Sequence, residues 1–165
     1  MLDIITFGDY VLREQTERIT DFGPEIRVLA DAMIEAMRSE RGIGLAGPQV
    51  GVLKKIFVVD LPEEQQARVF VNPEIIETSP ELVSYEEGCL SIPGMYSEVM
   101  RPAAVAVQAQ DVQGKRFTVR ADGLLARVIQ HENDHLNGVL FIDRIPESER
   151  ERIEKLYAKR SKRKR

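Results

Sequence analysis

The sequence predicts a fold that combines helices with antiparallel strands. Two separate stretches carry apolar residues at three- and four-residue spacing, which is typical of amphipathic helices. Between them lie short runs rich in β-branched and aromatic residues, separated by turn signals instead of helical patterns. Parallel strands need long crossover connections, so these runs are expected to pair antiparallel.

Composition places the chain among soluble folded proteins. It has 165 residues, of which 43% are hydrophobic and 30% charged, enough for a core that needs no disulfide or metal. The single cysteine, Cys89, excludes an intramolecular disulfide, so a reduced, cytoplasmic location is expected. We find no secretory signal in MLDIITFGDY and no apolar run long enough for a membrane span.

The elements follow one another as helix, strands and hairpin. The first helix is predicted from Pro24, and glycines at 42 and 44 end it. Its apolar stripe consists of Ile26, Leu29, Ala30, Met33, Ile34 and Met37. KKIFVVD (54–60), RVFVN (68–72) and ELVSYEE (81–87) read as strands, broken by Pro62, Asn72-Pro73 and Ser79-Pro80. VAVQAQDVQGKRFTVRA (105–121) predicts a hairpin turning at Gln113-Gly114.

Two further helices are expected. The second spans 122–137, with Asp122 as its cap and Gly138 as the glycine after its end. Leu124, Val128, His131 and His135 share one of its faces, so the histidines continue an apolar, inward-facing stripe. The third helix is predicted from about residue 147 to residue 157, before a basic tail.

Both histidines of the chain fall in QHENDHLNGVL (130–140). At positions i and i+4 of a helix, His131 and His135 can reach one ion, and Glu132 can approach its open side as a proton acceptor. As core residues without a metal, two buried imidazoles would need polar partners on an apolar stripe, which is costly. The pattern therefore predicts a catalytic metal site.

A catalytic metal needs a third protein ligand. Downstream candidates are Asp143, Glu147 or a glutamate of the third helix, and the upstream candidate is Cys89 in EEGCLSIPG. A lone cysteine is often a small buried hydrophobe. Two histidines poised for a metal reverse that preference and favour Cys89.

Three segments occur in a characteristic order: GIGLAGPQVG (42–51), EGCLS (87–91) and QHENDHL (130–136). They closely resemble the three signature motifs of the peptide deformylases, which hydrolyse the N-formyl group from formyl-methionine at the start of nascent polypeptides. The resemblance implies an α+β fold, with a central H-E-x-x-H helix surrounded by antiparallel sheets, and a C-terminal helix. We accordingly expect one catalytic domain over 1–145, and a helix with a basic tail over 146–165.

The resemblance also implies roles for single residues. Cys89, His131 and His135 match the metal ligands, and Glu132 matches the general acid and base. Gln49 and the backbone N–H of Leu90 match the groups that stabilise the oxyanion. The implied cofactor is one Fe²⁺ ion per chain, for which Zn²⁺ or Ni²⁺ can substitute.

The segment GIGL has two readings from residues alone, a tight turn or a platform that pairs with an extended peptide. The resemblance favours the platform, with Ile43, Gly44 and Leu45 as its residues. An apolar pocket for the methionine side chain is expected from Leu124, Val128 and Ile92. Glu87 and Arg101 match positions near that pocket, where they form either a supporting ion pair or ordinary surface charges. Gly47 replaces the family's usual alanine, which is expected to loosen the loop around Gln49.

The basic C-terminal tail suggests a binding role, and two alternative functions are compatible with the histidine motif. The last eight residues, AKRSKRKR, hold six bases on an otherwise acidic chain: Lys159, Arg160, Lys162, Arg163, Lys164 and Arg165. They are either a solvated terminus or a contact for ribosomal RNA near the exit tunnel. A general metallo-endopeptidase would take its third ligand downstream. A structural metal module would need a fourth protein ligand and would leave Glu132 without a role.

Overall fold

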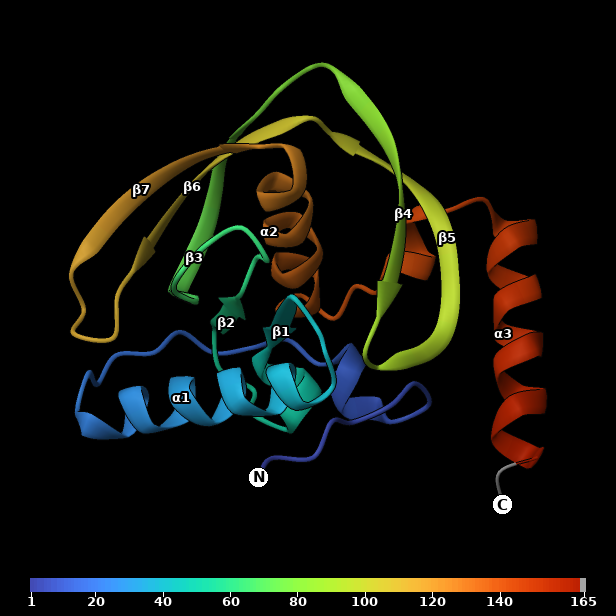
Figure 1. The fold of residues 1–165 in the computed structure, drawn as a ribbon, viewed down its shortest axis with the longest axis horizontal. Helices are drawn as coiled ribbons and strands as arrows, with labels where there is room; N and C mark the ends of the chain where they lie inside the picture. Colours follow the sequence, from blue (N-terminus) through green and yellow to red (C-terminus); the bar gives the residue numbers. More distant parts are fainter. Residues whose placement is uncertain (164–165) are drawn as a thin grey trace.

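A computed structural model describes residues 1–163 (Figure 1). The fold is α+β, as predicted. Its helices are α1 (Pro24–Ser39), α2 (Gly123–His135) and α3 (Glu147–Arg163), with short 3-10 turns η1 (Tyr10–Arg13), η2 (Gly47–Val50) and η3 (Phe141–Arg144). Its strands are β1 (Gly44–Ala46), β2 (Ile56–Val59), β3 (Arg68–Thr78), β4 (Leu82–Cys89), β5 (Ile92–Pro102), β6 (Ala104–Gln110) and β7 (Arg116–Asp122).

Two antiparallel sheets enclose the helix that carries the histidines. One sheet has the order β1-β2-β3-β6-β7, and the other is the β4–β5 hairpin. Figure 1 shows α2 between them, with α1 below and α3 outside β5. The α2 residues Ala126, Val128 and Ile129 pack into one core with the larger sheet. This arrangement confirms the central helix surrounded by antiparallel sheets.

The first helix and the hairpin were well predicted. α1 begins at Pro24, and its inward stripe is buried at Ile26, Ala30, Met33 and Met37. β6 and β7 pair over their whole length, from the pair of residues 104 and 122 to the pair 110 and 116. Alternation of apolar residues therefore identified both partners of this hairpin correctly.

The predicted end of RVFVN at Asn72-Pro73 is wrong, because β3 continues to Thr78. Asn72 adopts a positive φ of 50°, and the register of β3 against β6 shifts just after it. Its side chain accepts a hydrogen bond from the N–H of Ile19 and donates one to the Ile19 carbonyl, both at 2.8 Å. The strand thus passes through an irregularity that these side-chain bonds stabilise.

Two strands, β1 and β5, were not predicted from the sequence. β5 carries proline, glycine and charged residues, and its half-exposed hairpin gives no clean alternation. β1 has only three residues, which is too short for any periodic pattern. Both border the functional site, so the gap in the prediction coincides with the site.

The ends of the second and third helices differ slightly from prediction. α2 ends at His135, so Gly138 lies one position later than predicted, at a φ of +74°. Asp122 occupies the N-cap position, but its side chain makes no capping hydrogen bond. α3 continues past Tyr157 to Arg163, and Lys164 and Arg165 lie outside the described residues.

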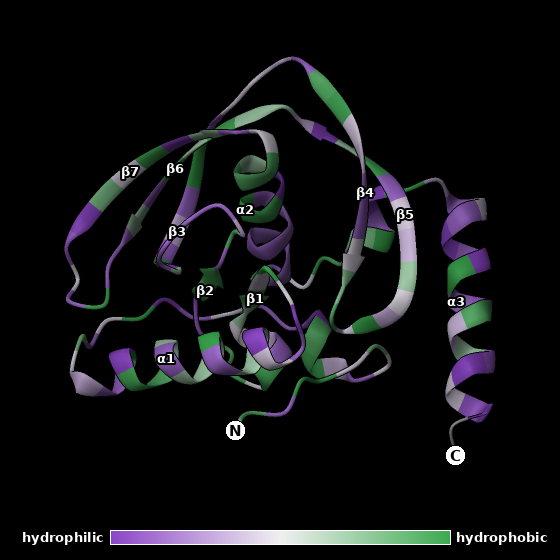
Figure 2. Cartoon of the chain, viewed as in Figure 1, coloured by the Kyte–Doolittle hydropathy of each residue, from purple (hydrophilic) through white to green (hydrophobic). Residues whose placement is uncertain are grey.

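α3 packs on the domain through a narrow apolar stripe. Ile153 is buried, and Tyr157 meets Phe7 edge-on with ring centroids 5.7 Å apart, while Leu156 stays exposed. Figure 2 shows that many of the other residues of α3 are hydrophilic. Within residues 1–163, no helix has the length and apolar character that crossing a membrane requires.

Candidate metal centre and active site

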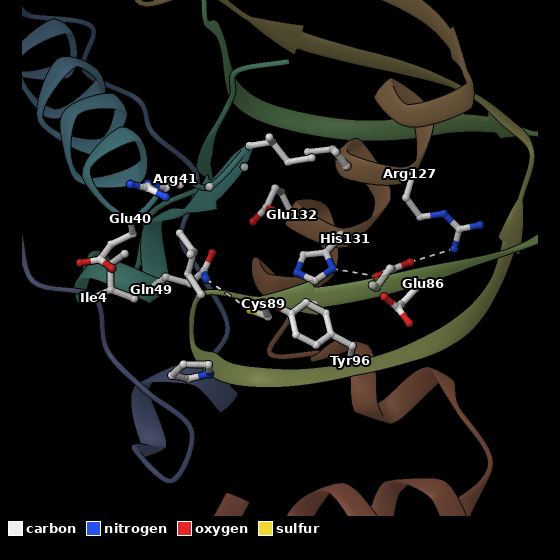
Figure 3. A pocket seen from close by; sticks show the side chains of 18 of the residues that line it. Ile4, Glu40, Arg41, Gln49, Glu86, Cys89, Tyr96, Arg127, His131 and Glu132 are labelled. Carbon is white, nitrogen blue, oxygen red and sulfur yellow. Dashed lines mark hydrogen bonds and ion pairs between the residues drawn. The ribbon is translucent and has the colours of Figure 1, made fainter. Parts of the chain in front are cut away.

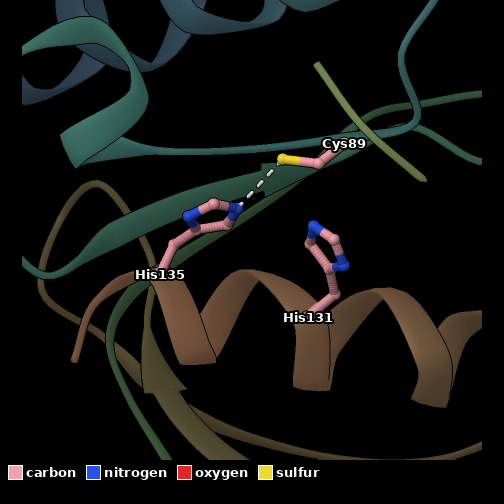
Figure 4. Close-up of side chains that lie close together, drawn as sticks. All are labelled: Cys89, His131 and His135. Atoms are coloured by element: carbon pink, nitrogen blue, oxygen red, sulfur yellow. Dashed lines mark hydrogen bonds between the residues drawn. The ribbon is translucent and has the colours of Figure 1, made fainter. Parts of the chain in front are cut away.

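The cysteine and the two histidines meet at one point, although more than 40 positions separate the cysteine from either histidine in sequence. Cys89 ends β4, where the hairpin register shifts, and His131 and His135 project from adjacent turns of α2. The possible ligand atoms of these three residues lie within 4.8 Å of one another. Figure 4 shows the Cys89 thiol facing the His135 ring, with Sγ and Nε2 3.4 Å apart.

The His131 ring is oriented from behind by a carboxylate. Its Nδ1 lies 2.8 Å from Glu87 Oε1, and because Glu87 is ionised, Nδ1–H donates and Nε2 is left to face the cluster. Burial acts to lower the pKa of His131, but the charge of Glu132 and the hydrogen-bonding contacts with Cys89 and Glu87 raise it well above its usual value. The site therefore favours positive charge at this point.

This donor set fits a divalent transition metal. It offers one thiol and two imidazoles, which are ligand types that zinc prefers, and their number is that of a catalytic site with three protein ligands. Burial lowers the pKa of His135 well below its usual value, which keeps its ring neutral and able to coordinate. The cavity leaves one side of the cluster open, as a catalytic centre requires.

Glu132 lies beside the cluster without belonging to it. The side chain is only 4% exposed, and its Oε1 has no hydrogen-bond partner among residues 1–163. Burial is the main cause that raises the pKa of Glu132 to about 7. A carboxyl with such a pKa can both accept and return a proton near neutral pH.

Gly44 of β1 lies directly against Glu132 and lines the cavity beside the cluster. A Cβ atom at this position would overlap the Glu132 carboxylate and lie 2.8 Å from Val128 Cγ1. β1 is an edge strand, and the Asp60 N–H donates to the Ile43 carbonyl. In antiparallel pairing the bonded residues alternate, so the N–H and C=O of Gly44 point away from β2 towards the cavity. A glycine is needed here for space.

Gln49 is fixed by three contacts. Its Oε1 accepts from the Ala46 N–H at 2.9 Å, and its Nε2 donates to Ser91 Oγ at 3.1 Å and approaches Cys89 Sγ at 3.5 Å. The amide group is therefore held next to the thiol (Figure 3). Leu90 follows Cys89 directly. A well-ordered amide at this place can stabilise a developing negative charge.

The expected loosening at Gly47 is not what the structure suggests. A Cβ atom at Gly47 would lie 2.5 Å from the Val52 carbonyl oxygen and 2.9 Å from that of Lys54. The N–H groups of Gly51 and Val52 both bond to the Gly47 carbonyl. Here the following turn packs against the glycine, so an alanine would have no room in this chain.

A buried network of charges lies behind the cluster. Glu87 and Arg101, offered from sequence as an ion pair or as surface charges, are an ion pair, with exposures of 5% and 4% and a shortest distance of 2.6 Å. The network also includes residues that the sequence analysis missed: Arg127, which bonds to Glu87, and Asp134, which joins Arg101 to Arg144.

The helical spacing of Arg127 and Asp134 could have indicated that they belong to this network. Arg127 lies four residues before His131 on the same helix and Asp134 three after it, so both can approach the neighbouring hairpin from one face. The arginines Arg101 and Arg127 join the β4–β5 hairpin, which carries Cys89, to the helix that carries the histidines. The network thereby aligns the two halves of the cluster.

A cavity of about 790 Å³ opens onto the cluster. Of the residues expected to bind substrate, Ile43, Gly44, Leu124 and Val128 line it. Leu45 and Ile92 do not, because their side chains are fully buried in the hydrophobic cores. Figure 3 shows Glu40 and Arg41 at one side of the cavity, and Glu86, Tyr96 and Arg127 at the other.

Comparison with known proteins assigns the family. The family model for polypeptide deformylase matches residues 1–151. A peptide deformylase of Prochlorococcus marinus strain AS9601 is 49% identical over 147 residues, which cover 87% of this chain and 73% of the relative. One from Agrobacterium fabrum is 48% identical over 159 residues, covering 94% of each chain.

Solved structures agree. The peptide deformylase of Synechococcus elongatus in complex with actinonin superposes with a TM-score of 0.89 at 46% identity, covering 92% of this chain and 85% of the other. That of Legionella pneumophila gives a TM-score of 0.93 at 36% identity and covers 99% and 97%. This chain therefore belongs to the peptide deformylase family, metal-dependent hydrolases that remove the N-formyl group from nascent polypeptides.

Proposed function

We propose that Cys89, His131 and His135 bind the catalytic metal of this deformylase and that Glu132 carries the proton. The observation that supports this most directly is the meeting at one cavity of a thiol, two imidazoles and the Glu132 carboxyl group, whose Oε1 has no hydrogen-bond partner within residues 1–163. A divalent ion held by this donor set acidifies water and polarises a carbonyl group. The remaining steps belong to the side chains around it.

Glu132 takes the proton of the attacking water and returns it to the departing amine nitrogen. Its raised pKa suits both directions of transfer. The Gln49 amide and the Leu90 N–H are proposed to donate hydrogen bonds to the oxyanion that forms on the formyl oxygen. Loss of one such donor typically slows the chemical step by ~10²–10³.

The substrate backbone is proposed to pair with the free edge of β1. Gly44 supports this role best, because its N–H and C=O point to the cavity and the lack of a side chain lets a peptide approach closely. Leu124 and Val128 then offer apolar surface to the methionine side chain. Leu45 and Ile92 act behind this surface, by supporting β1 and the start of β5.

Fe²⁺ is proposed as the native ion, one per chain. A thiolate with two imidazoles accepts both Fe²⁺ and Zn²⁺, and the metal supply decides between them. Anaerobic purification followed by metal analysis and measurement of formate release from formyl-Met-Ala-Ser tests both the metal and the reaction. We expect about one iron per chain and an activity that follows the iron content.

The third ligand separates this proposal from a metallo-endopeptidase. Asp143, a downstream candidate, accepts hydrogen bonds from Arg13 and from the Leu140 N–H, and it pairs with Arg150. It is therefore occupied away from the cluster. We expect Cys89→Ala to lose the metal and Asp143→Asn to keep it, and the reverse result would contradict the proposal.

The basic helix end is proposed to dock the enzyme on ribosomal RNA in the cytoplasm. A groove of about 580 Å³ between α3 and the start of β5 is lined by Arg152, Lys159, Arg160 and Arg163. Lys162 lies nearby on α3, and Lys164 and Arg165 fall outside the described residues. Cations along one helix face suit a phosphate backbone.

Removal of residues 158–165 tests this docking. We expect nearly unchanged turnover of a formylated tripeptide and weaker co-sedimentation with ribosomes at low salt. Each neutralised phosphate should add ~0.7–0.9 to the slope of log affinity against log salt. Equal co-sedimentation of the truncated chain would leave the tail as a solvated terminus.

A further inference from the structure

One short segment at the start of β5, residues 93–96, borders both the active-site cavity and the groove beside α3. Gly94 and Tyr96 line both openings. Met95, which lies between them, is buried in the same hydrophobic core as Ile153 of α3. The segment is therefore a shared rim, with the proposed peptide site on one side and the proposed RNA site on the other.

Arg160 of α3 lies directly over Gly94 in this rim. A Cβ atom at Gly94 would overlap Nη1 of Arg160 and would lie 2.9 Å from its Cζ. Gly94 also has a φ of +79°, which residues with a side chain rarely adopt. The glycine thus gives the guanidinium room to rest on the backbone of the rim. Figure 1 shows how α3 runs alongside β5, which brings the two residues together.

The charge of Arg160 is available to a ligand. Arg150 and Arg152, earlier on α3, are both paired with carboxylates. Arg160 is exposed, and it takes part in no ion pair among residues 1–163. A phosphate in the groove would offer the guanidinium a charged acceptor, which the backbone at Gly94 does not.

The rim also touches the strand end that carries the cysteine of the cluster. The Tyr96 ring lies over Gly88, where a Cβ atom would be 2.5 Å from the ring atom Cε1. Gly88 precedes Cys89, and both line the cavity with Tyr96. The position of the rim therefore affects the shape of the cavity mouth.

We propose that Arg160 is a positioning residue that holds the rim in place, and that RNA bound in the α3 groove weakens peptide binding by drawing Arg160 away from Gly94. The inference rests on the proposed peptide site and RNA docking. A rim that is held before the peptide arrives binds it more tightly than one that must be ordered on binding. Because peptide and RNA favour different positions of one guanidinium, each lowers the affinity for the other by the same factor.

The first test needs no RNA and uses the metal-loaded enzyme. Arg160→Gln should raise KM for formyl-Met-Ala-Ser by about 2- to 5-fold, the effect of losing one exposed contact, with kcat unchanged. Removal of residues 158–165 should raise KM equally. Lys155→Gln is the matched control and should keep the KM of the parent, because Lys155 is an exposed cation of α3 that lines neither opening. An unchanged KM in Arg160→Gln, or a loss of kcat instead, overturns the proposal.

The second test adds a short RNA duplex at low salt. Saturating duplex should raise the KM of the parent by a similar factor and leave that of Arg160→Gln unchanged. The product Met-Ala-Ser, at saturation, should weaken duplex binding to the parent by the same factor, measured by fluorescence anisotropy. Lys159→Gln, which removes another cation of the groove, should bind the duplex more weakly and yet keep the KM shift at saturation. Duplex that binds without changing KM overturns the coupling alone, whereas duplex that does not bind contradicts the RNA docking and the coupling together.

Discussion

Replacement of Glu87 by glutamine would test whether the buried charge network joins the hairpin to the helix. Glutamine keeps the shape of the side chain but removes the charge that Arg101, Arg127 and His131 contact. Both arginines are buried, so each would lose part of the negative charge that balances its own, and water could not solvate it instead. Breaking a buried ion pair costs about 3–5 kcal/mol. For a chain of this size that lowers Tm by roughly 6–20 °C.

Urea and thermal unfolding would measure this loss, with Glu86→Gln as the control. Glu86 is the adjacent carboxylate on β4 but is exposed, so its neutral variant should stay within about 0.5 kcal/mol of the parent. Competition with a chelator should also show metal affinity about 10- to 100-fold weaker in Glu87→Gln, because the ring of His131 loses its support. If Glu87→Gln is no less stable than the control, the network does not hold the two halves together.

Three further predictions concern other parts of the chain. Gly47→Ala should lower stability by roughly 1–3 kcal/mol in urea unfolding, because its Cβ would meet the Val52 carbonyl, and an unchanged midpoint would contradict that packing. Burial alone would raise the pKa of Asp143, but hydrogen bonds from Arg13 and a backbone N–H lower this pKa overall. The ionised Asp143 therefore stabilises the fold fully above about pH 4, the pKa of an unfolded aspartate. This stabilisation is lost as the pH falls through the lowered pKa of the folded state. The stability difference between the parent and Asp143→Asn should therefore shrink on acidification, and a constant difference would argue against it. With Cys89 as ligand, both the thiolate and Fe²⁺ can be oxidised, whereas Zn²⁺ cannot. The Fe²⁺ form should therefore lose activity in air faster than the Zn²⁺ form, and equal rates would refute iron as the sensitive group.

Local patterns in the sequence identified most of the fold. The stripe of α1 and the alternation of β6 and β7 report burial on one face, which is a local property and can be read from spacing. β5 could not be read this way. It forms because it pairs with β4, and its Gly94 adopts a φ of +79° that no periodic pattern reveals.

The site residues likewise fall into those that local spacing predicts and those that depend on tertiary packing. His131, Glu132 and His135 were placed by helical spacing alone, but their distance from Cys89 depends on how the hairpin packs against α2. Arg127 was overlooked because a charged residue on a helix is usually solvated. Its burial is acceptable only because Glu87 and two carbonyl groups of the hairpin accept its hydrogen bonds, and those partners are distant in sequence.

The role of Glu132 is the central claim, and one variant tests it directly. Glu132→Gln keeps the size of the side chain and removes its ability to accept a proton, while Cys89, His131 and His135 remain as ligands. We predict the same metal content per chain as the parent, measured by metal analysis after anaerobic purification. Formate release from formyl-Met-Ala-Ser should fall by at least ~10². Loss of the metal, or hydrolysis at the parent's rate with the metal bound, would contradict the assignment of Glu132 as the group that moves the proton.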